Sequence, residues 1–335
     1  LASDTGQLAN MTNDAIKFLV QSIPNIKHIQ ARYHMLRWSA CTLLLHLGRL
    51  VAPQSLLSYA TRFDDALNIV AADLLATTTL THEQLQIVKT PTKQAGLGLG
   101  GPLQTMQHAF AASAGEVARF YRDPTIGWHD RTQLAHMLAA RPSVIAAASE
   151  VNDDLRRSRR GARLLLNPTA PQFWPRQQHL AQIIATQRAN DLEEKLTKVD
   201  CQLASWFASG RQMGGSGFLA AIPSLPCFRV SSSVFQTMLC MRLLSDIPGT
   251  SQIRQCPCGD AHTPFLRNGT HWISSCEDCS QSSVRHNKLI PIITRALREI
   301  KRPITEGETA NWLRGNRSLR PFDLVTSGPA LEEPG

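Results

Sequence analysis

The chain has 335 residues, 43% of them hydrophobic and 6% aromatic, and its formal net charge is +9. This length and hydrophobic content allow two or three compact units with a sizeable core. No stretch is long and apolar enough to span a membrane, and no signal peptide is visible. These features predict an intracellular protein, nuclear or cytoplasmic, and they argue against a membrane partner.

The excess of positive charge predicts an anionic partner, and nucleic acid is the usual one. Four of the eight cysteines gather between Cys256 and Cys279, while the others are scattered among apolar neighbours. That distribution favours a reducing compartment with one metal site over a disulfide framework. The first residue is Leu1 rather than methionine, which is what we expect of a piece of a longer protein.

Residues 14 to 90 read as a series of helices, among them a long one predicted over residues 29 to 47. A following segment carries apolar residues at helical spacing, namely Leu56, Tyr59, Ala60, Phe63, Leu67, Val70 and Leu74. Thr81, with Gln84 three residues later, predicts a capping box at the start of the next helix.

A glycine-rich segment, "KQAGLGLGGP", runs from Lys93 to Pro102. A phosphate-binding loop would need Lys-Ser or Lys-Thr after its last glycine, and a dinucleotide fold would need a strand before it. Because neither is present, the segment predicts a flexible turn whose backbone approaches a neighbouring helix. The helix after it is expected to turn Met106, Phe110 and Val117 inward.

An arginine cluster follows in "NDDLRRSRRGARLLL". Its guanidinium groups can bind phosphates, although the preceding Asp153 and Asp154 suit a solvated helix face equally well. The candidate phosphate contacts are Arg156, Arg157, Arg159 and Arg160. A proline-punctuated linker at residues 168 to 175, a polar helix at about 177 to 203, and a buried helix capped by Ser232 or Ser233 come next.

Four cysteines and three histidines lie in the polar stretch from Cys256 to Leu289. Spacing offers two tetrahedral ligand sets: Cys256 and Cys258 with His271 and Cys276, or the same two with Cys276 and Cys279. Either set is closed, which predicts a structural zinc ion. A catalytic zinc would keep an open position and a carboxylate base, and Glu277 and Asp278 match no hydrolytic ligand pattern.

The segment "NKLIPIITRALREIKR" predicts an amphipathic helix directly after the metal-ligand stretch. Its polar face is basic, and Arg285 lies two positions before it, which predicts salt-dependent contact with a nucleic-acid backbone. An ordinary surface helix is the alternative. The candidate contacts are Arg285, Lys288, Arg295, Arg298, Lys301 and Arg302.

The order of several motifs resembles reverse-transcriptase-like proteins of non-LTR retrotransposons, downstream of the polymerase palm. These motifs are "CPCG", "GTHWISSC", "RHNKLI", "RPITEGE" and "LRPFDLV", and the upstream "QIVKTPTKQAGLGLGGPLQTMQHAFAAS" resembles the same proteins. The resemblance covers most of the chain and is weakest from about residue 120 to 200. In that family a Cys-Cys-His-Cys zinc knuckle precedes a restriction-enzyme-like endonuclease.

The resemblance implies Cys256, Cys258, His271 and Cys276 as zinc ligands, and it matches Asp323 to the first nuclease carboxylate. A polymerase motif with paired aspartates is absent from the sequence. Only twelve residues follow Asp323 in this sequence, with no lysine among them, and we therefore do not expect a complete nuclease site within them. The parent protein would copy RNA into DNA and nick its target, whereas this chain is expected to keep neither catalytic centre.

Together these features predict a mainly α protein. Residues 1–120 are expected to form a thumb-like helical region, 121–250 a helical connector, and 251–335 a zinc knuckle, a basic helix and the truncated start of an α/β nuclease fold. The expected function is nucleic-acid binding by a fragment of a retroelement-derived polyprotein. A helical protein-interaction scaffold with structural zinc and a divalent-metal-dependent nuclease are the alternatives.

Overall fold

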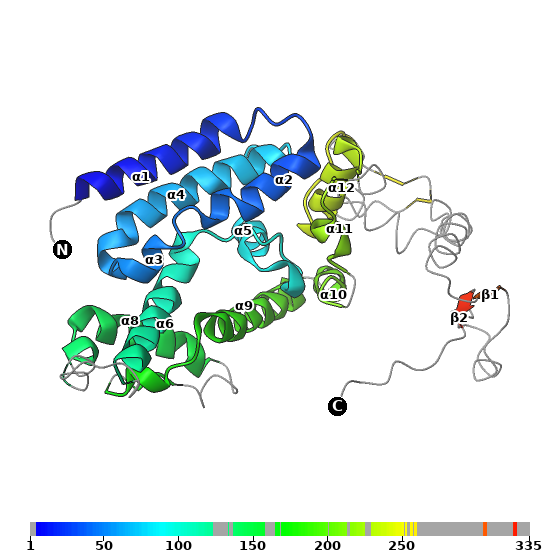
Figure 1. The fold of residues 1–335 in the computed structure, drawn as a ribbon. Helices are drawn as coiled ribbons and strands as arrows, with labels where there is room; N and C mark the ends of the chain where they lie inside the picture. Colours follow the sequence, from blue (N-terminus) through cyan, green and yellow to red (C-terminus); the bar gives the residue numbers. More distant parts are fainter. Residues whose placement is uncertain are drawn as a thin grey trace, which may run out of the picture. The chain divides into compact units, whose positions relative to one another are not determined.

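The computed structural model is mainly α-helical (Figure 1). It describes residues 5–122, 133, 137–157, 165–167, 169–199, 201–212, 215–224, 229–250, 252, 255–256, 258–259, 304–306 and 324–326. The chain divides into two compact units, Leu1–Ser251 and Gln252–Gly335. Among the described residues, no helix combines the length and the apolar run that a membrane crossing needs.

The described part of the N-terminal unit consists mainly of helices. The longer helices are α1 (Thr5–Lys17), α2 (Ile29–Trp38), α4 (Pro53–Leu74), α5 (His82–Lys89), α6 (Pro102–Arg122), α8 (Pro142–Arg156), α9 (Gln177–Val199), α10 (Cys201–Ser209) and α12 (Ser232–Arg242). Short helices are α3 (Leu47–Leu50) and α11 (Gly217–Ala220), together with 3-10 turns at Ala40–Thr42, Thr92–Gln94 and Pro171–Phe173 and a π-helical turn at Phe18–Ser22.

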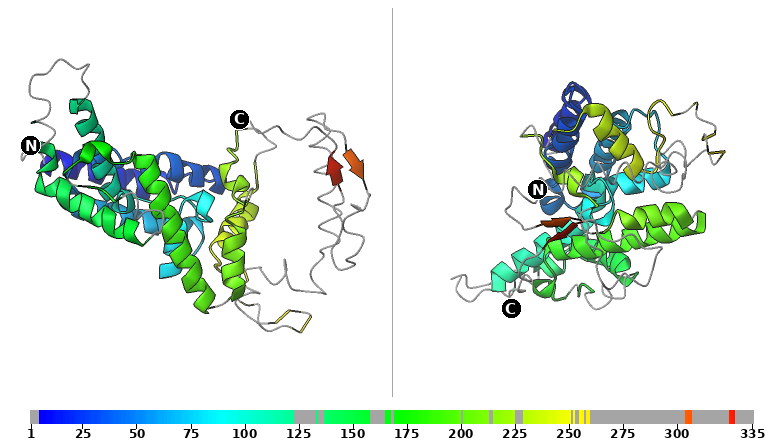
Figure 2. Two further views of the ribbon diagram at one scale, coloured as in Figure 1. Left: turned by 90° about the horizontal axis from the view of Figure 1, so that it is seen from below. Right: turned by 90° about the vertical axis from the view of Figure 1, so that its right-hand side faces the viewer.

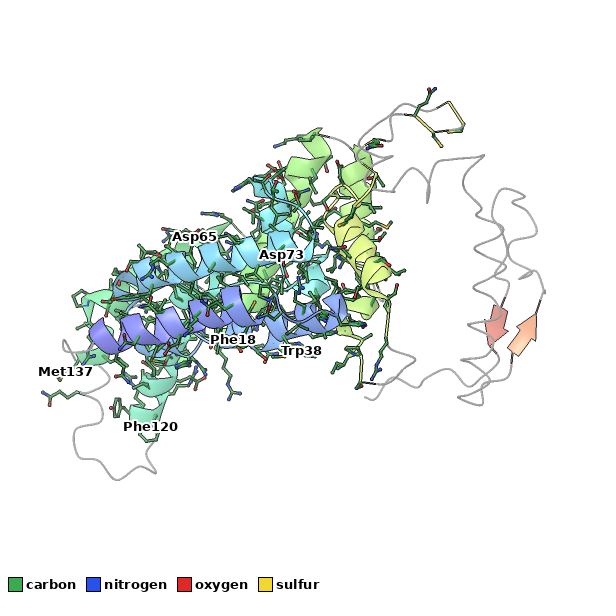
Figure 3. All side chains as sticks on the ribbon, turned by 90° about the horizontal axis from the view of Figure 1, so that it is seen from above. Phe18, Trp38, Asp65, Asp73, Phe120 and Met137 are labelled. Carbon is green, nitrogen blue, oxygen red and sulfur yellow. The ribbon has the colours of Figure 1, made fainter. Side chains whose placement is uncertain are left out.

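Within this unit, α1, α2 and α4 lie together on one side, and α8 and α9 lie on the other (Figures 1 and 2). Helix α6 packs against α3, α4, α8 and α9, so it joins the two sides. Arg32 ties α2 to α4 because its guanidinium lies 2.7 Å from Oδ2 of Asp73. Asp73 is labelled in Figure 3. The Arg32 side chain also donates hydrogen bonds to the carbonyls of Pro24 and Ile26, which fixes the turn before α2.

Local sequence signals explain where several helices begin. The predicted capping box is confirmed: the Thr81 hydroxyl accepts from Gln84 N, and the Gln84 side chain accepts from Thr81 N. Proline occupies the first turn of α4 and of α8, where a missing N–H costs nothing. Helix α12 is capped one residue earlier than predicted, because the Ser231 hydroxyl accepts from Val234 N.

The long helix predicted over residues 29 to 47 is wrong, because α2 ends at Trp38 and a 3-10 turn follows. The Thr42 hydroxyl donates to the carbonyls of Trp38 and Ser39, at 3.0 and 2.9 Å. Such side-chain hydrogen bonds offer the backbone an alternative to a regular helix. The chain therefore turns here, and it continues into α3.

The main hydrophobic core takes residues from both ends of the N-terminal unit. The apolar stripe predicted along α4 is buried, except that Tyr59 is half-buried. Tyr33 and Phe235 are fully buried against each other, with ring centroids 5.7 Å apart, so α2 and α12 share this core. Two segments some 200 residues apart in sequence thus depend on one another for burial.

A second core lies where α6 packs against α8, and here the prediction for Val117 was wrong. Val117 is 39% exposed and Phe110 is half-buried, whereas Met106 is buried as expected. The buried face of α6 consists mainly of small residues, namely Ala109, Ala111, Ala112, Ala114, Gly115 and Ala118. Small side chains let neighbouring backbones come close, and a Cβ at Gly115 would lie 2.9 Å from the Pro171 carbonyl oxygen.

The predicted linker at residues 168 to 175 is packed rather than loose in its described part. Trp174 is 2% exposed in the second core, and its indole N–H donates to the Asn167 carbonyl at 2.7 Å. The polar helix expected over 177 to 203 ends at Val199, and α10 begins at Cys201.

In the C-terminal unit, two short strands are described, β1 (Ile304–Glu306) and β2 (Leu324–Thr326). They pair in antiparallel register, with Thr305 opposite Val325. The zinc knuckle, the basic helix and the nuclease-like start predicted for residues 251–335 otherwise lie outside the described residues. The division predicted at residue 120 likewise stays a prediction.

Candidate nucleic-acid interface

Two of the four predicted zinc ligands belong to the described residues. Cys256 is 3% exposed, Cys258 is half-buried, and the N–H of Gly259 donates to the Cys256 carbonyl at 2.9 Å. Gly259 has φ of +92°, a value that glycine adopts readily, so the turn depends on this residue.

Thiolates on such a short turn suit zinc, which prefers sulfur and imidazole ligands. His271, Cys276 and the alternative ligand Cys279 lie outside the described residues. Within the described part of the chain, no group of three or more candidate ligands comes together. The zinc site therefore stays a prediction, and the two cysteines that are described are compatible with it.

Two of the four predicted phosphate-binding arginines are described, at the end of α8. Arg156 lies 2.7 Å from Asp153, and Arg157 lies 3.6 Å from Asp154. Both guanidinium groups are about 60% exposed, so these pairs contribute roughly 0–1 kcal/mol and a phosphate can replace the aspartate. Arg159 and Arg160 lie outside the described residues.

The predicted basic segment of the C-terminal unit and the predicted nuclease carboxylate also lie outside the described residues. This applies to Arg285, Lys288, Arg295, Arg298, Lys301, Arg302 and Asp323. Their assignment continues to depend on the sequence pattern alone.

The N-terminal unit contains a hollow of about 530 Å³ beside the glycine-rich segment. We call it the basic hollow, and residues 90 to 101 the glycine loop. The loop forms one wall, the beginning of α6 a second, and α9 a third. Its lining includes four cationic side chains and no carboxylate among the described residues. The charged and histidine side chains that line it are Arg37, Lys89, Lys93, Arg188 and His108.

The glycine loop is fixed to the helix before it by its own backbone. The N–H groups of Leu97, Gly98 and Leu99 donate to the carbonyls of Ile87, Thr90 and Val88, at 3.1, 2.8 and 3.0 Å. Gly98 has φ of +69°, which favours glycine. The turn and its close approach to a helix are therefore confirmed, whereas the flexibility predicted for it is not a property of this hydrogen-bonded backbone, which forms one wall of the basic hollow.

A buried ion pair supports the other end of the loop. Asp64 of α4 is 2% exposed, and its Oδ2 lies 3.3 Å from Lys89 Nζ. Its Oδ1 accepts from Leu103 N at 3.4 Å. Burial raises the pKa of Asp64, and the Lys89 ammonium and the Leu103 N–H act in the opposite direction. Because Asp64 neutralises Lys89, this cation adds less positive charge to the hollow than its neighbours do.

Two arginines hold the loop from the side of α2 and α12. Arg242 donates to the carbonyls of Thr92, Gly210 and Gly215 at 3.0 to 3.2 Å, and Arg37 donates to the Thr92 hydroxyl at 3.2 Å. Neither has a carboxylate within ion-pair distance among the described residues. Burial lowers the pKa of Arg242 to about 10, so it stays charged at neutral pH.

His108 of α6 forms part of the wall between the basic hollow and a neighbouring hollow of about 430 Å³. The residue is 4% exposed, and its Nε2 has no hydrogen-bond partner among the described residues. Burial, followed by the positive charge of Arg188, lowers the pKa of His108 to about 4. The imidazole is thus neutral at pH 7. An unpaired buried polar atom costs about 1–3 kcal/mol, so a ligand that pairs with it gains stability.

Charge is distributed unequally between the two hollows. The neighbouring hollow is lined by Glu150, Asp153 and Asp154, which face Arg157 and Arg188. Arg188 lies 3.2 Å from Asp154, so part of its charge is compensated there. Lys93 is exposed and has no ion pair within the described part of the chain. An anion is therefore favoured on the side of Lys93 and disfavoured on the side of the aspartates.

Sequence reasoning missed the basic hollow. The glycine-rich segment lacks the signature of phosphate-binding motifs, and the polar helix α9 carries no motif of its own. The available signal was the glutamines and the arginine along that helix, of which Gln178, Gln182 and Arg188 line the hollow. Only the fold brings them to within reach of Lys93, about 90 positions earlier in the sequence.

Comparison of the chain with protein-family models, with curated proteins and with solved structures finds no match.

Proposed function

We propose that the chain is a nucleic-acid-binding segment of a retroelement-derived polyprotein that contains a reverse transcriptase and an endonuclease, and that it is not itself a catalyst. The observation that carries the binding part is the lining of the basic hollow, four cations without a carboxylate among the described residues. The retroelement origin is supported by the order of the sequence motifs.

Phosphate binding in this proposal is shared between two regions. Lys93 and Arg188 offer charge in the N-terminal unit, and the basic segment from Arg285 to Arg302 offers it in the C-terminal unit. Cys256, Cys258, His271 and Cys276 would hold a structural zinc ion that orders the chain before the basic segment. Neutralised phosphates release counterions, so the affinity must fall with salt.

The test is a fluorescence anisotropy titration of the full chain with labelled RNA and DNA oligonucleotides at several salt concentrations. We expect log Kd to rise linearly with log salt, with a slope of about 3 for a single strand that makes about four phosphate contacts. Replacing Arg295, Arg298 and Lys301 with Gln should lower that slope by about 2.

The matched control replaces Lys17, Lys27 and Arg49 with Gln, which removes the same charge from the N-terminal 50 residues. It should leave the slope within about 0.5 of its original value. A binding signal that does not respond to salt contradicts the proposal. Magnesium-dependent nicking of plasmid DNA that Asp323→Ala abolishes would establish a nuclease instead.

A further inference from the structure

The basic hollow has the size of a small-ligand site. Its volume of about 530 Å³ falls within the range of roughly 300–1,000 Å³ typical of pockets for small organic ligands. One nucleotide fits such a space, whereas a double helix does not. A nucleic acid that uses the hollow must therefore present an unpaired nucleotide.

Hydrogen bonds between the walls hold the hollow open. The Gln94 side chain donates to the Thr186 hydroxyl at 3.1 Å, which joins the glycine loop to α9. Arg188 reaches the Gln104 carbonyl at 3.5 Å and Asp154 at 3.2 Å, which joins α9 to α6 and α8. Because the walls are already in place, little ordering is needed when a ligand enters.

The rim and the floor of the hollow differ in chemistry. Lys93 and Arg188 are exposed, and the glutamines Gln178 and Gln182 on α9 are exposed as well. His108 and Ile184 are 4% and 3% exposed, and Ala181 and Ala185 are half-buried beside them. A hydrated phosphate suits the cationic rim, and a planar, partly apolar base suits the floor.

The floor also offers hydrogen bonds that a base can use. Neutral imidazole carries one donor and one acceptor nitrogen, and Nε2 of His108 has no partner within the described residues. The half-buried Gln104 and, at the rim above it, the exposed Gln182 add amide groups, and glutamine can pair with the edge of a base through both its donor and its acceptor. A phosphate alone would leave these groups unused.

We propose that the basic hollow binds one nucleotide of a single-stranded nucleic acid, with its phosphate at Lys93 and Arg188 and its base beside His108 and the glutamines of α9. This inference rests on the proposed function, because it assigns a particular site and a single-stranded ligand to the nucleic-acid binding. Duplexes then bind through the exposed cations elsewhere and leave the hollow empty.

The first test fills the hollow without changing charge. Ala181→Phe should weaken binding of a labelled single-stranded oligonucleotide about tenfold and leave binding of a duplex of the same length within twofold. Ala146→Phe is the matched control, since Ala146 is also a half-buried alanine on a helix, α8, but does not line the hollow. The control should bind single strands as the original chain does.

A second variant tests the inference independently in case Ala181→Phe does not fold. Lys93→Ala removes an exposed side chain without an ion partner in the described residues, and it should weaken single-strand binding about fivefold to tenfold. Lys195→Ala removes the same charge from an exposed position of α9 that does not line the hollow, and it should change the affinity by less than about twofold.

The outcomes separate this inference from the proposed function. If the original chain binds with the expected salt slope while Ala181→Phe and Lys93→Ala bind single strands unchanged, the hollow is not the site and the general proposal stands. Equal weakening of single-strand and duplex binding by Ala181→Phe also overturns the inference. If the original chain binds no nucleic acid at all, both proposals fail.

Discussion

His108 is a single residue whose protonation reports on the N-terminal unit. It is almost completely buried, and burial with the nearby Arg188 lowers its pKa to about 4 from an ordinary value of 6.5. The unfolded chain binds a proton at this histidine below about pH 6.5, whereas the folded chain does so only near pH 4. As the pH falls across that interval, proton binding therefore favours the unfolded state.

We expect the free energy of unfolding to decrease between pH 6.5 and 4 by about 3 kcal/mol on account of His108. Urea denaturation at several pH values measures this, and His108→Leu should remove most of the slope. A residual slope is expected because burial also lowers the pKa of His34. An unchanged slope in His108→Leu would show that the histidine is not buried in a neutral form.

The sequence alone predicted the structural role of some residues and not of others. The Thr81 and Gln84 capping box was predicted because both partners lie within one turn. His108 was not, because its burial depends on α8 and α9, which follow far later in the chain. Val117 was misplaced because helical spacing identifies a face, while the packing partner decides whether large or small residues line it.

The glycine loop shows how one element depends on close contact. A Cβ atom at Gly101 would lie 2.1 Å from Asp64 Oδ1 and 2.8 Å from its Cγ. The loop can therefore pass the buried carboxylate only because residue 101 has no side chain. Displacing Asp64 would also disturb its contacts with Lys89 and with the beginning of α6.

We expect Gly101→Ala to lower the free energy of unfolding by about 1–3 kcal/mol, the usual cost of forcing an extra group into a packed site. Gly217→Ala is the control, because a Cβ added there would have nothing within 4 Å and the residue begins the short helix α11. Gly217→Ala should change the free energy of unfolding by no more than about 0.5 kcal/mol. Chemical denaturation of both variants measures these free energies. Equal stability of the two variants would show that the glycine loop can shift to accommodate a side chain at residue 101.

Patterns within an element were more predictable than its ends. The stripe along α4 followed from period alone, and the turn at residues 93 to 102 followed from its glycines. The end of α2 at Trp38 did not, since it depends on hydrogen bonds of the Thr42 hydroxyl that compete with the helix. The basic hollow could not be predicted, because its walls come from the glycine loop, α6 and α9, which only the folded chain brings together.

At the scale of the whole molecule, the two compact units separate the described core from the predicted zinc ligands. We expect purified protein to contain one zinc ion per chain, measured by elemental analysis. His271→Ala should lose the ion and Cys279→Ser should keep it, if the ligands are Cys256, Cys258, His271 and Cys276. Cys227→Ser serves as the control because it lies outside both ligand sets.

The reverse result, with the ion kept in His271→Ala and lost in Cys279→Ser, would select the second ligand set. A protein without zinc would contradict the metal site altogether. Removing zinc with a chelator should leave the thermal unfolding of the N-terminal unit unchanged, since its two cores contain none of the predicted ligands.

Because Tyr33 and Phe235 cover each other, the helical unit cannot be shortened from either end without exposing part of its core. A chain that ends near residue 120 has α2 without α12, so Tyr33 and the apolar side chains around it lose the cover of Phe235 and face water and other chains. Loss of either segment from residues 1–250 thus yields an aggregation-prone product. A chain that ends just after Ser251 keeps both Tyr33 and Phe235. The smallest segment that can fold without exposing this core is therefore the entire helical unit.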